Sequence, residues 1–403
     1  MIVISGGDLV LPECVVPGGS LIVDGPRIVA LETGGVVDPA GASAIDARGC
    51  LVVPGFIDVH VHGVAGHDTL GAGDALQSIA RVLPRFGVTS FCPTSVACPP
   101  EPLRAFLGQV RRARIARDRG AARVLQAHLE SNFISTEYRG AQPLACLRVP
   151  TDGGAALTTS VEAGRTFTGR QILGVIADAR DEVGLVTLAP ELPGALDLVR
   201  ALTAAGHRVS LGHSGADFET AMAAIDVGAR HATHLFNRMT PLSHRAPGLA
   251  GAVLGREEVA AELICDGYHV HPSICRLALA AKGPRAIMAI TDGTAASALP
   301  VGETARLGDT VIRAGARAAF LDDGTLAGST LTMDRAFAHI VTGLGRSVVD
   351  AALMCSTTPA RELSLRGLGV LEEGALADIV LLDKQLTVVR TFIEGHEAYR
   401  AGA

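Results

Sequence analysis

Histidines and carboxylates stand at or just beyond the ends of several apolar runs in this sequence. Side chains of these types can bind a divalent metal or transfer protons. They are His60, His62, Glu130, His213, His234, His269 and Asp292. A single histidine at such a place is more often a hydrogen-bonded structural residue. Their joint occurrence at matching places instead favours one shared active site.

The pair His60 and His62 is the strongest local signal. Alternation along a strand points both imidazoles to the same side, where they can bind one ion or frame a pocket. Glu130 closes another apolar run, and a carboxylate there is costly unless it is paired or bound to metal. His213 and His234 recur about one strand–helix unit apart. Together with Glu130 they match a catalytic zinc-type site with an open coordination position.

Lysine is scarce in this chain, where Lys282 and Lys384 both lie away from the ends of apolar runs. A carbamylated lysine that bridges two metals, as in some barrel hydrolases, is therefore excluded. The anchoring carboxylate must be Glu130 or an aspartate. We expect surface or supporting roles for the other histidines, with His244 and His271 as the first candidates for exceptions. These others are His67, His128, His207, His231, His244, His271, His339 and His396.

The elements that must position these residues follow from the hydrophobic pattern. Short apolar runs typical of buried strands cover residues 56–62, 88–94, 124–130, 185–190, 208–213, 231–235, 260–265 and 286–292. Amphipathic stretches typical of helices cover residues 75–86, 102–118, 195–205, 218–227 and 274–281. Eight buried strands, mostly followed by helices, predict an α/β fold of the TIM-like (β/α)8 barrel type, whose strand ends converge on one face. A doubly wound open sheet is the main alternative, although no G-x-G-x-x-G follows an early strand.

The two ends of the chain differ from the middle in their hydrophobic pattern. Short β-like runs broken by glycine fill the first 50 residues and recur from about residue 369. We expect the two ends to pair into a small β-sandwich domain, residues 1–53 and 360–403, with the barrel at residues 54–359.

Composition excludes several classes of protein. The 403 residues are 48% hydrophobic and 19% charged, as in folded globular chains. The net charge of −6 and the lack of a basic block predict no nucleic-acid partner. No apolar stretch reaches the roughly 18 residues of a membrane span, so we expect no membrane association. The cysteines form no C-x-x-C pair and the first residues do not read as a signal peptide, which favours a cytoplasmic location.

Several motifs resemble one known family. Segment 54–63, PGFIDVHVHG, resembles the opening strand of the amidohydrolase superfamily. Further segments are similar to the N-acetylglucosamine-6-phosphate deacetylases of that superfamily: 128–130 (HLE), 212–214 (GHS), 232–239 (ATHLFNRM), 245–251 (RAPGLAG), 266–269 (DGYH), 290–292 (ITD) and 326–329 (LAGS). The resemblance covers nearly the whole chain. It implies a metal-dependent hydrolase that removes acetate from N-acetyl-D-glucosamine 6-phosphate.

The resemblance also implies roles for the metal-capable residues. Glu130, His213 and His234 would hold the main divalent ion, for which we expect Zn²⁺ first, with Fe²⁺, Mn²⁺ or Co²⁺ as alternatives. His60 and His62 would complete a second position, so that one or two ions bind. A metal lowers the pKa of its bound water toward neutrality, which suits attack on an amide.

Roles in catalysis and substrate binding follow from the same resemblance. Asp292 would act first as general base and then as acid, and His269 would polarise the acetamide carbonyl. Contacts to the sugar would come from Ala141, Asn237, Arg238, Ala327, Gly328 and Ser329. Arg245 would bind the phosphate of the amino sugar phosphate, since a guanidinium fork suits that group. In the family this arginine often comes from the neighbouring subunit, which implies a homodimer.

Four features near the expected sugar site depart from the family pattern. Ser131-Asn132 stands where Gly-Pro is usual, Gln142 where His is common, Arg238 where a small residue is usual, and the stretch 143–171 is long. They keep open a second hypothesis, a deacetylase of a different N-acylated amino sugar such as galactosamine 6-phosphate or a biosynthetic sugar conjugate. A non-catalytic sugar-phosphate-binding relative predicts lost ligands, whereas all of them are present. A cyclic amidohydrolase or deaminase is a fourth hypothesis, which the motifs that suit a phosphosugar disfavour.

Overall fold

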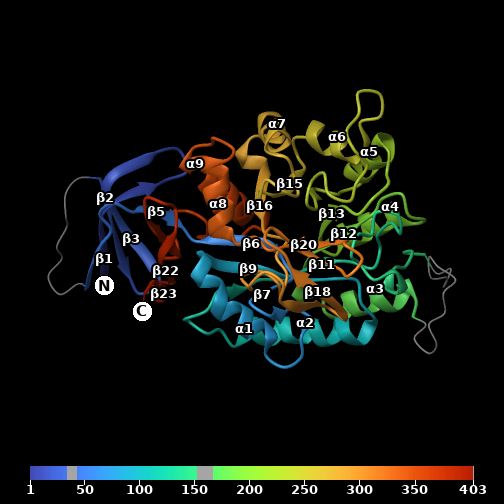
Figure 1. Ribbon diagram of the computed structural model, residues 1–403, viewed down its shortest axis with the longest axis horizontal. Coiled ribbons are helices and arrows are strands. Elements are labelled where there is room, and N and C mark those ends of the chain that lie inside the picture. The colour runs from blue at the N-terminus through green and yellow to red at the C-terminus, as the bar shows by residue number, and fades with distance from the viewer. Residues whose placement is uncertain (34–42, 152–166, 403) are drawn as a thin grey trace.

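The computed structural model describes residues 1–33, 43–151 and 167–402, and its central feature is a parallel barrel (Figure 1). The barrel strands in chain order are β6 (Phe56–Val61), β9 (Val88–Ser95), β10 (Arg123–Val124) with β11 (Ala127–Glu130), β12 (Val183–Leu188), β13 (Arg208–Leu211), β14 (His231–Ala232), β15 (Ala260–Ile264) and β16 (Ile287–Ile290). Neighbours along this order pair in parallel, and β10 and β11 both pair with β9, so together they occupy one strand position. The predicted (β/α)8 fold is confirmed.

The barrel closes between its first and last strands. The backbone N–H of Asp292 donates to the carbonyl of His60 at 3.0 Å, and Val61 forms a parallel bridge with Gly293. The buried carboxylate of Asp58 adds a side-chain link, because its Oδ2 accepts the hydroxyl of Thr291 at 2.6 Å. These contacts bring the ends of β6 and β16 together, where His60 and Asp292 stand.

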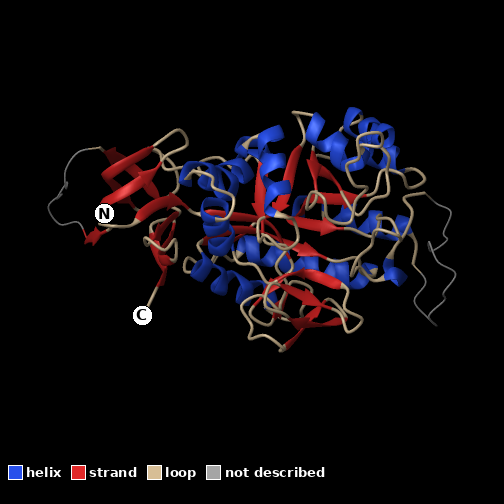
Figure 2. Cartoon of the chain, turned by 45° about the horizontal axis from the view of Figure 1, so that its top comes forward, coloured by secondary structure: helices blue, strands red, loops and turns tan. Residues whose placement is uncertain are grey.

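Helices surround the barrel strands (Figure 2). They are α1 (Ala75–Val82), α2 (Pro100–Ile115), α3 (Gly169–Asp178), α4 (Ala195–Ala204), α5 (Phe218–Asp226), α6 (Gly248–Gly255), α7 (Pro272–Lys282), α8 (Met333–Thr342), α9 (Val348–Ala352) and α10 (Thr358–Glu362). Short 3₁₀ segments cover Leu83–Phe86, Leu144–Cys146, Arg180–Glu182 and Pro284–Ala286, and a π-helical turn covers Leu353–Thr357. The five helices expected from the sequence are present. Five that were not expected are α3, α6, α8, α9 and α10; α6 is apolar almost throughout, and α9 and α10 have only five residues each, so none of these three shows an amphipathic run.

Strands from both chain ends form a second sheet, which lies to one side of the barrel (Figure 2). It contains β1 (Ile2–Val10), β2 (Val15–Asp24), β3 (Arg27–Glu32), β4 (Ser43–Asp46), β5 (Leu51–Pro54), β21 (Ile379–Leu382), β22 (Val388–Ile393) and β23 (His396–Arg400). The two ends meet where β5 pairs antiparallel with β21. Association of the chain ends, expected from the sequence, is confirmed, whereas the division into domains at residues 53 and 360 stays a prediction.

An arginine that is 11% exposed ties this end sheet to the barrel. Arg123 of β10 donates to Asp378 at 2.8 Å and to Glu394 at 2.9 Å, and both acceptors belong to the C-terminal segment. Asp378 is 2% exposed, so its end of this ion pair is shielded from solvent.

Small antiparallel elements follow the first and last barrel strands, and the sequence analysis did not anticipate them. β7 (Gly63–Val64) pairs with β8 (His67–Asp68), and β17 (Thr304–Leu307), β18 (Thr310–Ala314), β19 (Ala318–Phe320) and β20 (Leu326–Ser329) form a four-stranded sheet. A bridge between Gly293 and Ser329 sets β20 beside the end of β16. Of the helices in the described parts of the chain, none is both long and apolar enough to cross a membrane.

Candidate active site

Three metal-capable side chains meet where β11, β13 and β14 end. Oε1 of Glu130 lies 2.7 Å from Nε2 of His213 and 2.9 Å from Nε2 of His234. The two imidazole nitrogens are 3.0 Å apart, and all three side chains are buried. Ligand atoms around a tetrahedral zinc ion stand roughly 3.3 Å apart at bond lengths of about 2.0–2.1 Å. The separations are a few tenths of an ångström below that spacing.

The donor set of this group fits a cation. Nδ1 of His213 lies 2.8 Å from the carbonyl oxygen of Tyr138, which can only accept, so Nδ1 carries the proton. In the neutral ring, Nε2 then presents a lone pair to the oxygen of Glu130 and to the nitrogen of His234. Acceptor atoms that converge in a buried space need a positive charge among them, which a divalent ion supplies.

A second group adjoins the first. Nε2 of His60 and Nε2 of His62 are 3.2 Å apart, and each lies 3.4 Å from Oδ1 of Asp292. The other oxygen of Glu130, Oε2, lies 3.4 Å from Nε2 of His62. Glu130 therefore stands between the two groups, and the arrangement has room for one divalent ion in each.

The pKa values show how strongly these charges depend on one another. Burial lowers the pKa of His60 to about 3, against the opposing effect of nearby carboxylates. Burial would also lower the pKa of His62, but its interactions with Asp292 and Glu130 outweigh that effect and raise it to about 10. Burial would raise the pKa of Glu130, yet the neighbouring histidines hold it well below its ordinary value. The carboxylates are thus ionised and balanced by positive charge.

Three of these residues have a strained backbone. His213, His234 and Asp292 have φ angles of 48°, 30° and 47°, which few non-glycine residues adopt. Each follows a barrel strand by two residues, so the chain turns sharply just beyond the sheet. Strain of this kind is retained where function depends on it, and here it accompanies side chains directed at a common point.

His269 reaches the same pocket from the loop after β15. Its Nδ1 lies 2.7 Å from Oδ2 of Asp266, whose other oxygen accepts the backbone N–H of His269 at 2.9 Å. Nε2 of His269 is buried and has no hydrogen-bond partner among the described residues, and His269 lines the pocket. Asp266 accepts the proton of Nδ1 and so holds the ring with Nε2 directed into the pocket.

Side chains of both metal-capable groups open onto one pocket, which is lined by His62, Glu130, His213, His234 and Asp292 among others. Of the residues expected to contact the sugar, Ala141, Asn237, Arg238, His269 and Gly328 line it. Ala327 and Ser329 are buried behind it. Gly328 has φ +71°, and a Cβ there would stand 2.8 Å from the carbonyl oxygen of Asp292, so glycine is required at this position.

The two candidate arginines lie in different places. Arg238 is exposed and lines the pocket, and its guanidinium makes no hydrogen bond or ion pair with the described residues. Arg245 lies in the exposed loop of residues 241–246 and does not line the pocket of its own chain. Neighbouring His244 is also exposed, and His271 caps the start of α7 by accepting the N–H of Ser273.

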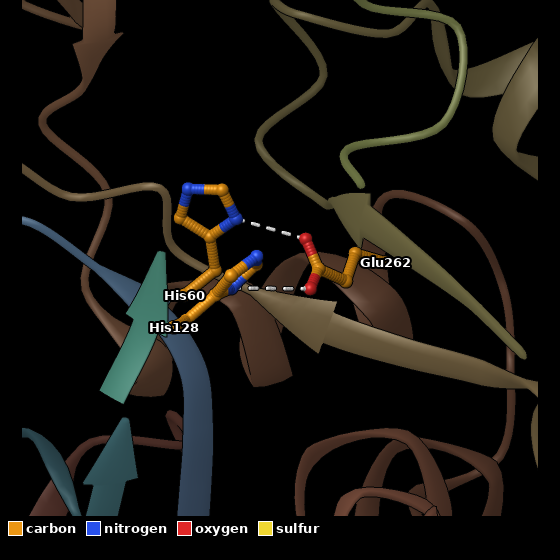
Figure 3. Close-up of side chains that lie close together, drawn as sticks. All are labelled: His60, His128 and Glu262. Carbon is orange, nitrogen blue, oxygen red and sulfur yellow. Dashed lines mark hydrogen bonds and ion pairs between the residues drawn. The ribbon is translucent and has the colours of Figure 1, made fainter. Parts of the chain in front are cut away.

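Two residues support the metal-capable groups in ways that the sequence pattern did not predict. Gln142 donates from Nε2 to Oε2 of Glu130 and accepts the N–H of Ala97 at 2.8 Å. Glu262, at the centre of β15, contacts His60 and faces His128 (Figure 3). Glu262 is therefore a buried glutamate beside the metal-capable groups that the sequence pattern did not single out.

The other departures from the family pattern have a structural role or lie partly outside the described residues. The hydroxyl of Ser131 donates to the carbonyl of Thr187 at 2.5 Å. Nδ2 of Asn132 donates to the carbonyls of Cys98 and Cys146 at 2.9 and 2.7 Å. Neither side chain lines the pocket. Of the long stretch 143–171, residues 152–166 lie outside the described residues.

Comparison with known proteins identifies the class. The model of the amidohydrolase family matches residues 51–398, and the chain belongs to this family of hydrolases. The resemblance to N-acetylglucosamine-6-phosphate deacetylases is also confirmed. That enzyme of Mus musculus is 36% identical over 410 residues, which cover 99% of this chain and 94% of the relative.

Two further relatives bear on the substrate. The N-acetylgalactosamine-6-phosphate deacetylase of Escherichia coli O157:H7 is 35% identical over 364 residues, covering 90% of this chain and 91% of the relative. A crystal structure of a mutant N-acetyl-D-glucosamine-6-phosphate deacetylase from Mycobacterium smegmatis in complex with N-acetyl-D-glucosamine-6-phosphate matches with a TM-score of 0.86. Its sequence is 31% identical, and the match covers 98% of this chain and 99% of that chain.

Proposed function

We propose that this protein is a metal-dependent deacetylase that hydrolyses N-acetyl-D-glucosamine 6-phosphate to acetate and glucosamine 6-phosphate. The observation that carries the proposal is the meeting of the Glu130, His213 and His234 group with Asp292 and His269 in one pocket. The names of the relatives that match nearly the whole chain support the choice of substrate.

Each residue has a chemical role in this proposal. Glu130, His213 and His234 would hold a divalent ion, with Zn²⁺ the first expectation, and His60 and His62 would hold a second. A bound ion would supply Lewis acidity that lowers the pKa of water and stabilises developing negative charge.

Proton transfer in the proposed reaction belongs to Asp292. The histidines around it hold its pKa below the ordinary value despite burial, so it is a carboxylate at neutral pH and can accept a proton from water. It would return that proton to the leaving amine. His269 would donate from Nε2–H to the acetamide oxygen, supported by Asp266.

The experiment is hydrolysis of N-acetylglucosamine 6-phosphate by metal-reconstituted protein, scored by release of free amine. Asp292→Asn should lower kcat by about 10²- to 10⁴-fold, the usual contribution of general acid–base catalysis. Circular dichroism and metal analysis should show a folded variant that keeps the ion at Glu130, His213 and His234. Activity within tenfold of the parent would remove Asp292 from its role, and no amine release by the parent would contradict the function.

A second candidate substrate follows from Arg238. This guanidinium favours a substrate with more negative charge or a differently placed anionic group, such as a larger sugar conjugate, and galactosamine 6-phosphate, the 4-epimer, stays a further alternative. A panel of glucosamine and galactosamine forms, each with and without 6-phosphate, separates the two candidates. The form with the highest kcat/KM identifies the sugar.

The proposal extends to a cytoplasmic homodimer in which Arg245 reaches the neighbouring active site. Its support is the exposed position of Arg245 outside the pocket of its own chain. Mixing Arg245→Ala with Asp292→Asn after subunit exchange tests this directly. If Arg245 acts across the interface, the Arg245→Ala subunit regains activity in the mixed dimer. If it acts within one chain, mixing restores nothing.

A further inference from the structure

The ring of His60 is completely buried, and its two nitrogens face different partners. Nδ1 lies 2.8 Å from Oε2 of Glu262, whereas Nε2 faces His62 at 3.2 Å and Asp292 at 3.4 Å. A carboxylate accepts the proton of Nδ1, which leaves the lone pair of Nε2 free toward the second metal-capable group. Glu262 thus selects the tautomer of His60 that can bind an ion.

Glu262 also reaches the first group through the backbone. The N–H of His234 lies 3.3 Å from the same oxygen, Oε2, and the N–H of Leu235 donates to the carbonyl of Glu262 at 2.8 Å. These contacts hold the turn in which His234 has its strained φ angle of 30°. One glutamate therefore touches a residue of each metal-capable group.

His128 borders the same carboxylate but has partners of its own. Its Nδ1 lies 3.6 Å from Oε1 of Glu262, and it contacts the carbonyl of Val59 at 3.1 Å (Figure 3). Its Nε2 lies 2.8 Å from the hydroxyl of Thr187. The carbonyl of Val59 accepts from Nδ1 and Nε2 accepts from Thr187, so His128 belongs to the buried polar network around Glu262 but has no lone pair free for a third metal position.

The cost of burying Glu262 indicates that it has a function. The residue is 0% exposed, and among the described residues its ion-pair partners are His60 and His128. Burying a carboxylate without a permanently charged partner costs free energy. An apolar side chain at this position, like those of its neighbours on β15, would fill the same space at a lower cost. A requirement to orient His60 accounts for its presence.

We infer that Glu262 is a positioning residue for the second metal position, where it fixes the tautomer and ring orientation of His60 while supporting the His234 turn. The inference rests on the metal sites of the proposed function, but it concerns binding of the ion and not the sugar. Replacing a residue that hydrogen-bonds to a metal ligand commonly lowers metal affinity by about 10- to 100-fold.

The test compares the parent protein with Glu262→Gln, which keeps the shape but removes the charge. Zn²⁺ alone is titrated into metal-free protein by calorimetry, and stoichiometry is checked by elemental analysis after dialysis. We expect two equivalents in the parent, and in Glu262→Gln a second equivalent bound about 10- to 100-fold more weakly, with the first within threefold. With Mn²⁺, the spin-coupled resonance of a metal pair should give way to that of a single ion.

Thr187→Val provides the matched control. It removes a hydrogen bond from the same buried network, on the side of His128, without touching His60. We expect this variant to retain both equivalents. Binding of a single ion by the parent, unchanged second-ion affinity in Glu262→Gln, or equal loss in Thr187→Val would each overturn the inference.

A measurement on the parent keeps the inference testable if Glu262→Gln does not fold. Histidine-selective ¹⁵N NMR should show His60 protonated at Nδ1, and a proton on Nε2 in the metal-loaded protein would overturn the inference. The metal experiments use no sugar, so their failure is distinct from failure of the proposed function. A two-ion protein with no deacetylase activity would leave the role of Glu262 intact.

Discussion

Arg238 offers the sharpest test of how the pocket recognises its substrate. The guanidinium is exposed, lines the pocket beside Gly140 and has no hydrogen-bond or ion-pair partner among the described residues. Replacing it with methionine removes the charge, keeps an unbranched stem and breaks no intramolecular bond. The stability of the fold should therefore change by less than about 0.5 kcal/mol.

The magnitude follows from the interaction that is lost. A hydrogen bond to a charged group contributes about 1.5–3 kcal/mol, and about 1.36 kcal/mol corresponds to a factor of ten in rate. If the anion that Arg238 meets is the 6-phosphate, Arg238→Met should lower kcat/KM for N-acetylglucosamine 6-phosphate by about 10- to 160-fold. For unphosphorylated N-acetylglucosamine the change should stay within about threefold, because that substrate lacks the anion.

Steady-state rates of amine release on both substrates provide the assay. Arg139→Met is the matched control: Arg139 precedes Gly140 but does not line the pocket, and it donates to the carbonyl of Thr136. Its kcat/KM should be unchanged on both substrates. Equal losses on the two substrates, or less than a twofold loss on the phosphorylated one, would refute the assignment of Arg238 to the anion.

Other predictions concern the supports of the site and the fold. Gln142→Leu removes the hydrogen bond to Glu130 and should weaken the first Zn²⁺ equivalent by about 10- to 100-fold in a competition titration; unchanged affinity would contradict this. Burial would raise the pKa of Glu362, but its hydrogen bond with His231 helps to lower that pKa below the ordinary value of 4.5. The ionised carboxylate therefore stabilises the fold fully above pH 4.5, and this stabilisation is lost as the pH falls through the pKa of the folded state. Glu362→Gln should therefore cost about 1 kcal/mol in urea unfolding at pH 7 and little near pH 3, and a cost independent of pH would disprove the assignment. Arg123→Met leaves two carboxylates of the end segment, Asp378 and Glu394, without their cationic partner. The free energy of unfolding should fall by about 3–5 kcal/mol in the same assay, and a fall of less than about 1 kcal/mol would contradict this prediction.

The barrel strands were predictable because each is a short, local run of buried apolar residues. The residues at which those strands end were harder to predict. The run 231–235 predicted five strand residues, whereas β14 contains only His231 and Ala232. The backbone leaves the sheet there and reaches a positive φ at His234. Geometry of this kind depends on contacts across the barrel, such as the one from Glu262, which a single apolar run does not reveal.

Supporting residues were harder to predict than the residues they support. Glu262 lies in the run AAELI, and a carboxylate within an otherwise apolar strand is costly, so its presence could have indicated a buried partner. Gln142 gave no such signal, because it lies in a loop and its link to Glu130 arises only in the folded chain. Likewise, nothing in the sequence pattern indicated that the sheet β17–β20 would set Gly328 against Asp292.

The departures from the family pattern differ in what they imply for the substrate. Ser131 and Asn132 bond to backbone carbonyls, so they shape the loop after β11 without facing the pocket. Gln142 faces the pocket, but its amide is engaged by Glu130 and by the backbone, so it acts on the metal position. Arg238 alone among these described residues presents an uncommitted polar group to the substrate. The choice between a glucosamine 6-phosphate and a different anionic amino sugar therefore depends on which anion this guanidinium meets. Comparing substrates that differ only in the position of their charge answers that question more directly than comparing epimers.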